Sequence, residues 1–158
     1  MSSLNLASLY EQDFQQWIEE TSKCLRNHDF EAIDLDHLIE ELDDLGKTNK
    51  ATLESNLAIL IAHLLKLNIQ CDAPEIMKNS WYNSVDEHRQ RVKKQLKKTP
   101  SLKSYWSTAL LEAYMDARKL AIKEGQRAKF GVNRHPEHDY PEQCPFSQDQ
   151  ILNDDFYG

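Results

Sequence analysis

The sequence predicts an all-α fold: an antiparallel bundle of four to five long helices, followed by a C-terminal arm and a short capped helix. Three observations support this fold class. Apolar side chains recur at helical spacing from about residue 8 to residue 124. The 158 residues include only four Gly and five Pro, whereas all-β folds need many tight turns. With 40% apolar and 28% charged residues, the chain is long enough to form a single globular domain over residues 1–158.

Two helices are expected in the N-terminal part of the chain. The first opens with a capping-box pattern of Ser8 and Glu11, and its apolar stripe consists of Tyr10, Phe14, Trp17, Ile18 and Leu25. The second has carboxylates near its start, which suit the positive end of the helix dipole. Its stripe consists of Leu35, Leu38, Ile39, Leu42 and Leu45, and Gly46 is its expected C-terminal stop.

A third helix is expected over residues 48–69, with an apolar arc wide enough for the centre of a bundle. The fourth starts near residue 79 and ends before Pro100. The fifth is capped by Ser101, ends at Gly125, and carries inward Leu102, Tyr105, Trp106, Ala109, Leu110, Ala113, Ala117 and Leu120. Residues 126–158 are expected to form an extended arm and a short terminal helix, capped by Ser147, that packs on the bundle.

Several functional classes find no support in the sequence. The start has no basic segment followed by an apolar run, and no stretch reaches the ~18 apolar residues of a membrane span. Three distant cysteines suit a reducing cytosol, so we expect a cytoplasmic protein. Neither a Gly-rich phosphate loop nor a G-x-S-x-G elbow is present, so no cofactor and no catalytic residue is assigned. Trp17, Trp81 and Trp106 lie on apolar stripes and are expected in the core.

Six stretches occur in order over nearly the whole chain: YEQDFQQWIEE, DHLIEELDDLG, LAILIAHLLKL, NSWYNSVDEHRQRV, TPSLKSYW and YPEQCPFSQDQILNDDFYG. Together they resemble the bacterial domain-of-unknown-function family numbered twenty-nine, which is abundant in cyanobacteria. The resemblance implies an all-α fold and a bacterial cytosolic protein. It implies no activity and carries over no catalytic residue.

A polar cluster of Glu41, His63 and His88 is one candidate site. These side chains flank or lie on the apolar stripes of three different helices, so a metal-dependent bundle enzyme is one alternative. The bundle pattern Glu-x-x-His is absent, and the local lookalike with His37 and Glu40 is expected to be solvated. The preferred interpretation is that His63 is a neutral histidine at the core boundary, hydrogen-bonded to a carboxylate or a carbonyl of a neighbouring helix. A zinc site in RHPEHDYPEQC is a weaker alternative because its ligands are loosely spaced.

Charge is unevenly distributed along the chain. Residues 1–46 hold twelve acidic and two basic side chains, and residues 88–103 hold seven basic and no acidic ones. The candidate partner-binding residues of the basic helix are Arg89, Arg91, Lys93, Lys94, Lys97 and Lys98, which are expected to face solvent around the His88–Val92–Leu96 stripe. Exposed aromatic residues for base stacking are not interleaved among them, so nucleic-acid binding is the less favoured alternative. We expect a protein-interaction module, with a protein partner or a homo-oligomer and no membrane association.

Overall fold

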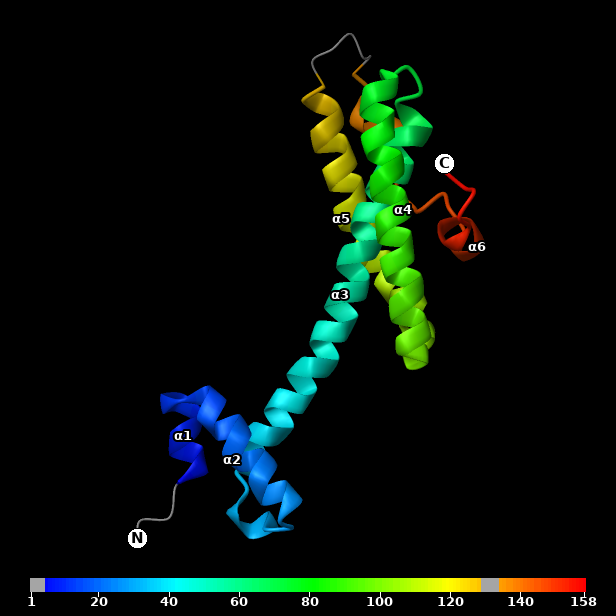
Figure 1. Cartoon of the computed structure of the whole chain (residues 1–158). Helices are drawn as coiled ribbons and strands as arrows, with labels where there is room; N and C mark the ends of the chain where they lie inside the picture. Colours follow the sequence, from blue (N-terminus) through cyan, green and yellow to red (C-terminus); the bar gives the residue numbers. More distant parts are fainter. Residues whose placement is uncertain (1–4, 129–133) are drawn as a thin grey trace. The chain divides into compact units, whose positions relative to one another are not determined.

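The computed structural model describes residues 5–128 and 134–158, and over these residues the protein is an all-α helical bundle without strands (Figure 1). The predicted fold class is confirmed. The α-helices are α1 (Leu6–Gln12), α2 (Phe14–Arg26), α3 (Leu35–Ile69), α4 (Glu75–Lys98), α5 (Trp106–Gln126) and α6 (Gln148–Leu152). The 3-10 helices are η1 (Phe30–Ala32), η2 (Pro100–Tyr105) and η3 (Glu137–Asp139). No helix in these described ranges is both long and apolar enough to cross a membrane.

Contacts between residues divide the chain into two compact units, Met1–Thr48 and Asn49–Gly158. The boundary falls within α3, so this helix contributes its residues up to Thr48 to the first unit and the rest to the second. That residues 1–158 behave as one domain stays a prediction.

α3 is one continuous helix of 35 residues where the sequence predicts two, so the expected stop at Gly46 is wrong. Gly46 does not adopt the left-handed conformation of a helix-ending glycine, since Gly158 is the one glycine among the described residues with a positive φ. A glycine inside a helix costs only about 1 kcal/mol relative to alanine. Ending the helix would instead leave four carbonyl groups without intrahelical partners. No proline interrupts residues 43–50, and the helix therefore continues.

The first predicted helix is divided in two at Asp13. This residue has φ −152° and ψ 87°, and its carboxylate accepts a hydrogen bond of 3.0 Å from the Gln16 N–H. Aspartate is among the preferred N-cap residues, so α2 begins directly after it. The predicted start at Ser8 is also wrong, because Asn5 caps α1 and accepts a hydrogen bond from the Ser8 N–H.

The start of α4 and the start of α5 also differ from the prediction. α4 begins at Glu75, about one turn before the predicted start near residue 79, because Pro74 takes the N-cap position, where its lack of an N–H costs nothing. Its end at Lys98, before Pro100, agrees with the prediction. Residues 100–105 form the 3-10 helix η2 in place of an α-helical start capped by Ser101.

The core of the second unit lies between α3, α4 and α5, which run side by side in Figure 1. Trp81 and Trp106 are 4% and 5% exposed, which confirms that they are core residues. α3 supplies the largest share of this core, with seven apolar side chains that are 0% exposed: Leu53, Leu57, Leu60, Ile61, Ala62, Leu64 and Leu65. The helix expected to be central is therefore central in this unit.

The C-terminal segment packs on the second unit. Phe146 and Ile151 are buried in its core, and α6 contacts α4 (Figure 1). The predicted cap is present: the Ser147 hydroxyl accepts from the Gln150 N–H at 3.2 Å, and the Gln150 side chain accepts from the Ser147 N–H at 2.9 Å. Residues 129–133 of the predicted arm lie outside the described residues.

Candidate protein-docking groove

The first unit carries many exposed apolar side chains over a small core. Its fully buried apolar residues are Leu6, Leu9 and Trp17. The stripe predicted to face inward over residues 35–45 is partly buried only at Leu38. Its other members are 48–63% exposed, and they are Leu35, Ile39, Leu42 and Leu45. The helical spacing of the stripe is correct, but its predicted burial is wrong, because Leu38 is its one member that packs against the small core of this unit.

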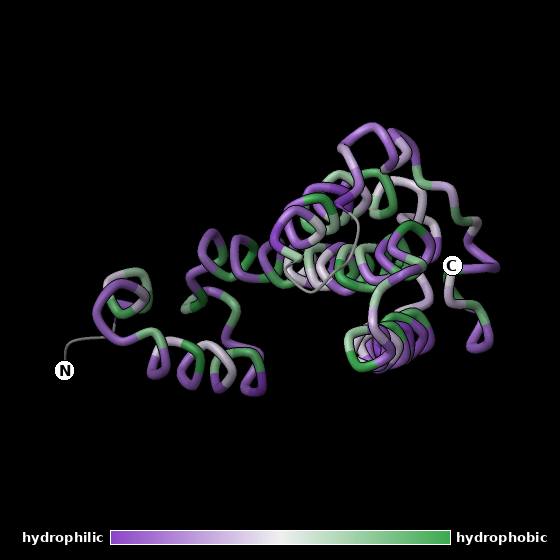
Figure 2. Tube along the Cα trace, turned by 90° about the horizontal axis from the view of Figure 1, so that it is seen from above, coloured by the Kyte–Doolittle hydropathy of each residue, from purple (hydrophilic) through white to green (hydrophobic). Residues whose placement is uncertain are grey.

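An apolar groove lies between α2 and the first part of α3. Phe14, Ile18 and Leu25 of α2 border it and are 38–44% exposed. The groove has a volume of about 340 Å³ and is lined by Phe14, Trp17, Ile18, Thr21, Ser22, Leu25, Leu38, Glu41, Leu42 and Leu45. We call this the docking groove. Figure 2 shows the amphipathic character of its helices, in which hydrophobic and hydrophilic positions alternate along the tube near the N-terminus.

Both helices of the docking groove follow heptad spacing. On α3, the intervals of three, four and three positions join Leu35, Leu38, Leu42 and Leu45. On α2, the same intervals join Phe14, Trp17, Thr21 and Cys24. Such positions form the packed seam of helical bundles, and Ile18 and Leu25 widen the α2 stripe by one further row. α2 and the first part of α3 thus each carry a row of side chains at the spacing of a packed helical seam.

Two polar atoms in the floor of the groove have no hydrogen-bond partner among the described residues. They are the Trp17 Nε1 and the Thr21 Oγ1, and the side chains that carry them are 2% and 3% exposed as whole residues. A buried polar atom without a partner costs about 1–3 kcal/mol. This cost falls on two residues of α2 that are themselves buried.

Aromatic contacts fix α1 against α2 and the start of α3 behind the groove. Tyr10 donates a hydrogen bond of 2.6 Å to Glu41 Oε1, and this bond is the main reason why the pKa of Tyr10 is raised to about 12. The Tyr10 ring stacks on the His37 ring with centroids 3.9 Å apart. His37 contacts Asp34 Oδ2 through Nδ1 at 2.5 Å. The aromatic stack and the Asp34 carboxylate cover part of His37, which remains 28% exposed, and Glu40 is exposed.

The charge of the first unit is strongly negative. Residues 1–48 hold twelve acidic and three basic side chains, whereas residues 49–158 hold fourteen acidic and sixteen basic ones. The net charges are therefore −9 and +2. A surface of one sign attracts partners of the other sign and repels its own copies, with a range of about 8 Å at physiological ionic strength.

The structure divides the predicted polar cluster. Glu41 lies in the first unit on Tyr10, whereas His63 and His88 lie in the second, with Nδ1 atoms 3.3 and 3.4 Å from the Ser84 hydroxyl. His63 Nδ1 also lies 2.8 Å from the Ile59 carbonyl oxygen. A carbonyl can only accept, so this nitrogen carries the proton. Burial lowers the pKa of His63, which agrees with a neutral boundary histidine. The carbonyl acceptor belongs to the same helix α3, so the expectation of an acceptor on a neighbouring helix is wrong for this contact.

The described residues contain no group of three or more His, Cys, Asp or Glu side chains placed to hold a metal ion. In the segment considered for zinc, His135 Nδ1 and His138 Nε2 lie 3.0 and 3.5 Å from carboxylate oxygens of Asp139. The Cys144 thiol donates to the Phe146 carbonyl at 3.6 Å. These contacts join residues at most four positions apart in the chain, as in a local turn.

The six basic residues of the predicted partner-binding helix have different environments. Arg89 is 1% exposed, so the expectation that it faces solvent is wrong. Its guanidinium donates to the carbonyls of Ile151 at 2.8 Å and Phe156 at 2.5 Å, and it thereby holds the C-terminal tail. Lys93 also binds the tail, through Asp154 at 2.9 Å. The other four are exposed, and they are Arg91, Lys94, Lys97 and Lys98.

The fold and this surface define an all-α helical protein with one uncovered, acidic helical hairpin. The chain belongs to the family described as Domain of unknown function DUF29, which matches residues 9–157. The predicted resemblance is therefore confirmed over nearly the whole chain. No curated protein and no solved structure matches the sequence.

Proposed function

We propose that the protein is a protein-interaction module whose docking groove binds an amphipathic helix, rich in Lys and Arg on its flanks, from a partner protein. The observation that carries this proposal is the exposed apolar surface on both walls of the groove. Five large apolar side chains among its lining residues are 38–63% exposed: Phe14, Ile18, Leu25, Leu42 and Leu45. Contiguous apolar surfaces of this kind in water mark interaction sites.

The spacing of these side chains supports a helix as the occupant. A groove between two helices with heptad spacing accepts the knobs of a further helix in the holes between its own side chains. Helix-in-groove recognition uses anchors at the same helical intervals.

The charge of the first unit supports a basic partner over a second copy of this chain. A second copy would bring another unit of charge −9 to the same interface, whereas Lys and Arg flanks would face the twelve acidic side chains of residues 1–48. Charge complementarity at an interface chiefly raises the association rate and excludes partners of like charge.

The experiment uses the full chain and two synthetic amphipathic helices with Leu at the seam positions, one with Lys and one with Glu on the flanks. Binding is followed by fluorescence anisotropy of labelled peptides, and oligomeric state by light scattering. We expect the Lys peptide to bind at least about tenfold more tightly than the Glu peptide, a difference of about 1.4 kcal/mol.

Two matched variants locate the binding surface. Leu42→Asp places a charge in the docking groove and is expected to abolish peptide binding. Leu111→Asp makes the same change at a residue of the second unit that is 71% exposed, and binding should remain. Equal binding by both variants would refute the proposed surface. A stable dimer without peptide that Leu42→Asp dissociates would assign the groove to a second copy instead.

The absence of catalysis and a cytoplasmic location stay predictions. The partner-binding role of Arg91, Lys94, Lys97 and Lys98 stays one as well.

A further inference from the structure

A second groove lies in the second unit, between α3 and α4, and its chemistry is opposite to that of the docking groove. It has a volume of about 500 Å³ and is lined by Asn49, Thr52, Asn56, Arg91, Lys94, Gln95, Lys98 and Thr99. We call it the basic groove. None of these eight residues is acidic or aromatic, and four of them are neutral side chains with an amide or a hydroxyl group on α3 and α4.

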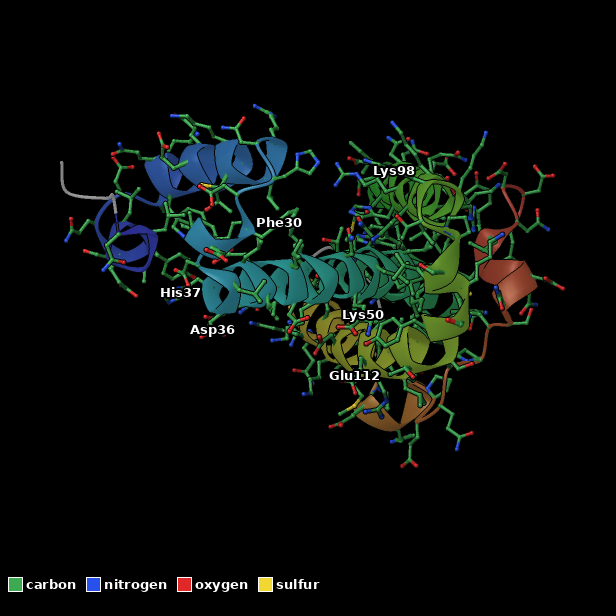
Figure 3. The ribbon with its side chains drawn as sticks, turned by 90° about the horizontal axis from the view of Figure 1, so that it is seen from below. Phe30, Asp36, His37, Lys50, Lys98 and Glu112 are labelled. Atoms are coloured by element: carbon green, nitrogen blue, oxygen red, sulfur yellow. The ribbon has the colours of Figure 1, made fainter. Side chains whose placement is uncertain are left out.

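One wall of the basic groove is a row of cations. Arg91, Lys94 and Lys98 follow one another at intervals of three and four positions on α4, so they share one face of the helix. Lys94 and Lys98 form no ion pair with any described residue, and Arg91 pairs with Glu87 at 2.5 Å. In Figure 3, side chains that end in nitrogen gather around Lys98. The row spans seven positions, or about 10 Å along the helix axis.

The opposite wall consists of neutral hydrogen-bonding side chains at matching intervals. Asn49, Thr52 and Asn56 share one face of α3. The two walls are joined by Gln95, whose side-chain N–H donates to the Asn49 carbonyl at 2.8 Å. Amide and hydroxyl groups also donate hydrogen bonds to phosphate oxygens, although without the charge of lysine. The groove therefore offers cations on one side and neutral donors on the other along the same 10 Å.

We propose that the basic groove binds a linear chain of phosphate groups, as in an inorganic oligophosphate or the phosphate chain of a nucleoside triphosphate. A single phosphate reaches only neighbouring cations, whereas successive phosphates along a chain can contact Arg91, Lys94 and Lys98 together. Stacking of bases would need aromatic side chains, and the lining has none. The phosphate chain itself is thus the recognised group.

The test uses the full-length protein and isothermal titration calorimetry with tripolyphosphate, orthophosphate, ATP and a single-stranded oligonucleotide, all without divalent metal and at matched ionic strength. Tripolyphosphate is expected to bind at least about tenfold more tightly than orthophosphate, because it can reach all three cations. ATP should bind within about threefold of tripolyphosphate, because the base adds no contact.

Matched double variants distinguish binding in the basic groove from non-specific electrostatic attraction to the positively charged helix α4. Lys94→Gln with Lys98→Gln removes two charges from the groove and should weaken tripolyphosphate binding at least about tenfold. Lys97→Gln with Lys103→Gln removes two exposed charges outside the lining residues, and binding should change less than about twofold. Both proteins should give the wild-type circular dichroism spectrum, because all four side chains are exposed.

Three results would overturn the proposal. Equal weakening by the two double variants would mean diffuse attraction to a basic helix. Much tighter binding of ATP than of tripolyphosphate would place the recognised group on the nucleoside. An oligonucleotide that binds more tightly than tripolyphosphate, and loses its affinity in the Lys94 and Lys98 variant, would assign the groove to nucleic acid. The docking groove lies in the other unit, so failure of either proposal leaves the other intact.

Discussion

The same helix has two different environments in the two units of this protein. In the second unit, α3 buries seven apolar side chains completely, and α4 and α5 pack against them. In the first unit, α3 has four large apolar side chains that are about half exposed. The amphipathic pattern is equally clear in both parts. An amphipathic pattern therefore identifies which face of a helix is apolar. It does not show whether another part of the same chain buries that face.

The largest expected effect comes from a matched pair of leucine truncations on α3. Leu57 is 0% exposed, so Leu57→Ala should lower the free energy of unfolding by about 2–5 kcal/mol. Leu42 is 58% exposed, and Leu42→Ala should change it by less than about 0.5 kcal/mol. Urea unfolding of both variants measures the difference. A similar loss in both would show that the first unit is covered in solution, and the comparison between the units would fail.

An intermediate effect is expected from removal of the cation that holds the tail. Arg89→Met keeps much of the side-chain volume but removes the donors to the carbonyls of Ile151 and Phe156. The carbonyls left without partners should lower the free energy of unfolding by about 1–3 kcal/mol, and tail amides should exchange faster with deuterium. Lys97→Met, at an exposed position of the same helix, is the control and should be nearly neutral. Unchanged tail exchange in Arg89→Met would contradict the proposed anchoring.

The smallest effect is a pH dependence of opposite sign in the two units. The hydrogen bond to Asp34 raises the pKa of His37 above 6.5, so His37 stabilises the first unit below about pH 6.5, and this contribution is lost as pH rises through its folded pKa. Burial lowers the pKa of His63 below 6.5. Its contribution is therefore present above about pH 6.5 and is lost as pH falls through its folded pKa.

NMR titration of the two imidazoles measures these pKa values directly. His37→Gln and His63→Gln, each followed by urea unfolding between pH 5 and 8, test their linkage to stability. Each variant should remove the pH dependence of its own histidine and leave that of the other. If the pKa values of His37 and His63 shifted in the same direction from 6.5, the two histidines would not have the opposite environments that the hydrogen bond to Asp34 and the burial of His63 imply.

Local rules explain the parts of the structure that the sequence predicts well. The all-α class, the end of α4 before Pro100 and the capping box of Ser147 with Gln150 all depend on neighbouring residues. The burial of Trp81 and Trp106 follows from their positions on apolar stripes of helices that lie inside one core. The caps at Asn5 and Asp13 could also have been predicted from the sequence, because Asn and Asp are preferred N-cap residues.

The burial of Arg89 could have been predicted from its position on the apolar stripe of α4, but the charge of the side chain argued for exposure. Val85, Arg89, Val92 and Leu96 follow intervals of four, three and four positions, so Arg89 continues the buried stripe of α4. A charged residue at such a position is buried only when its donors find acceptors. Those acceptors are carbonyl groups of a tail more than sixty residues away in the sequence, and only the tertiary structure brings them there.

The sequence by itself determined which segments are helical and which face of each helix is apolar, because these properties depend on residues within a few positions of one another. The tertiary structure decided that Arg89 is inside and that the stripe of Leu35, Leu42 and Leu45 remains uncovered. These outcomes depend on which distant surfaces meet. An apolar stripe is stabilised by any complementary surface, so its spacing alone cannot show whether that surface belongs to the same chain or to a partner.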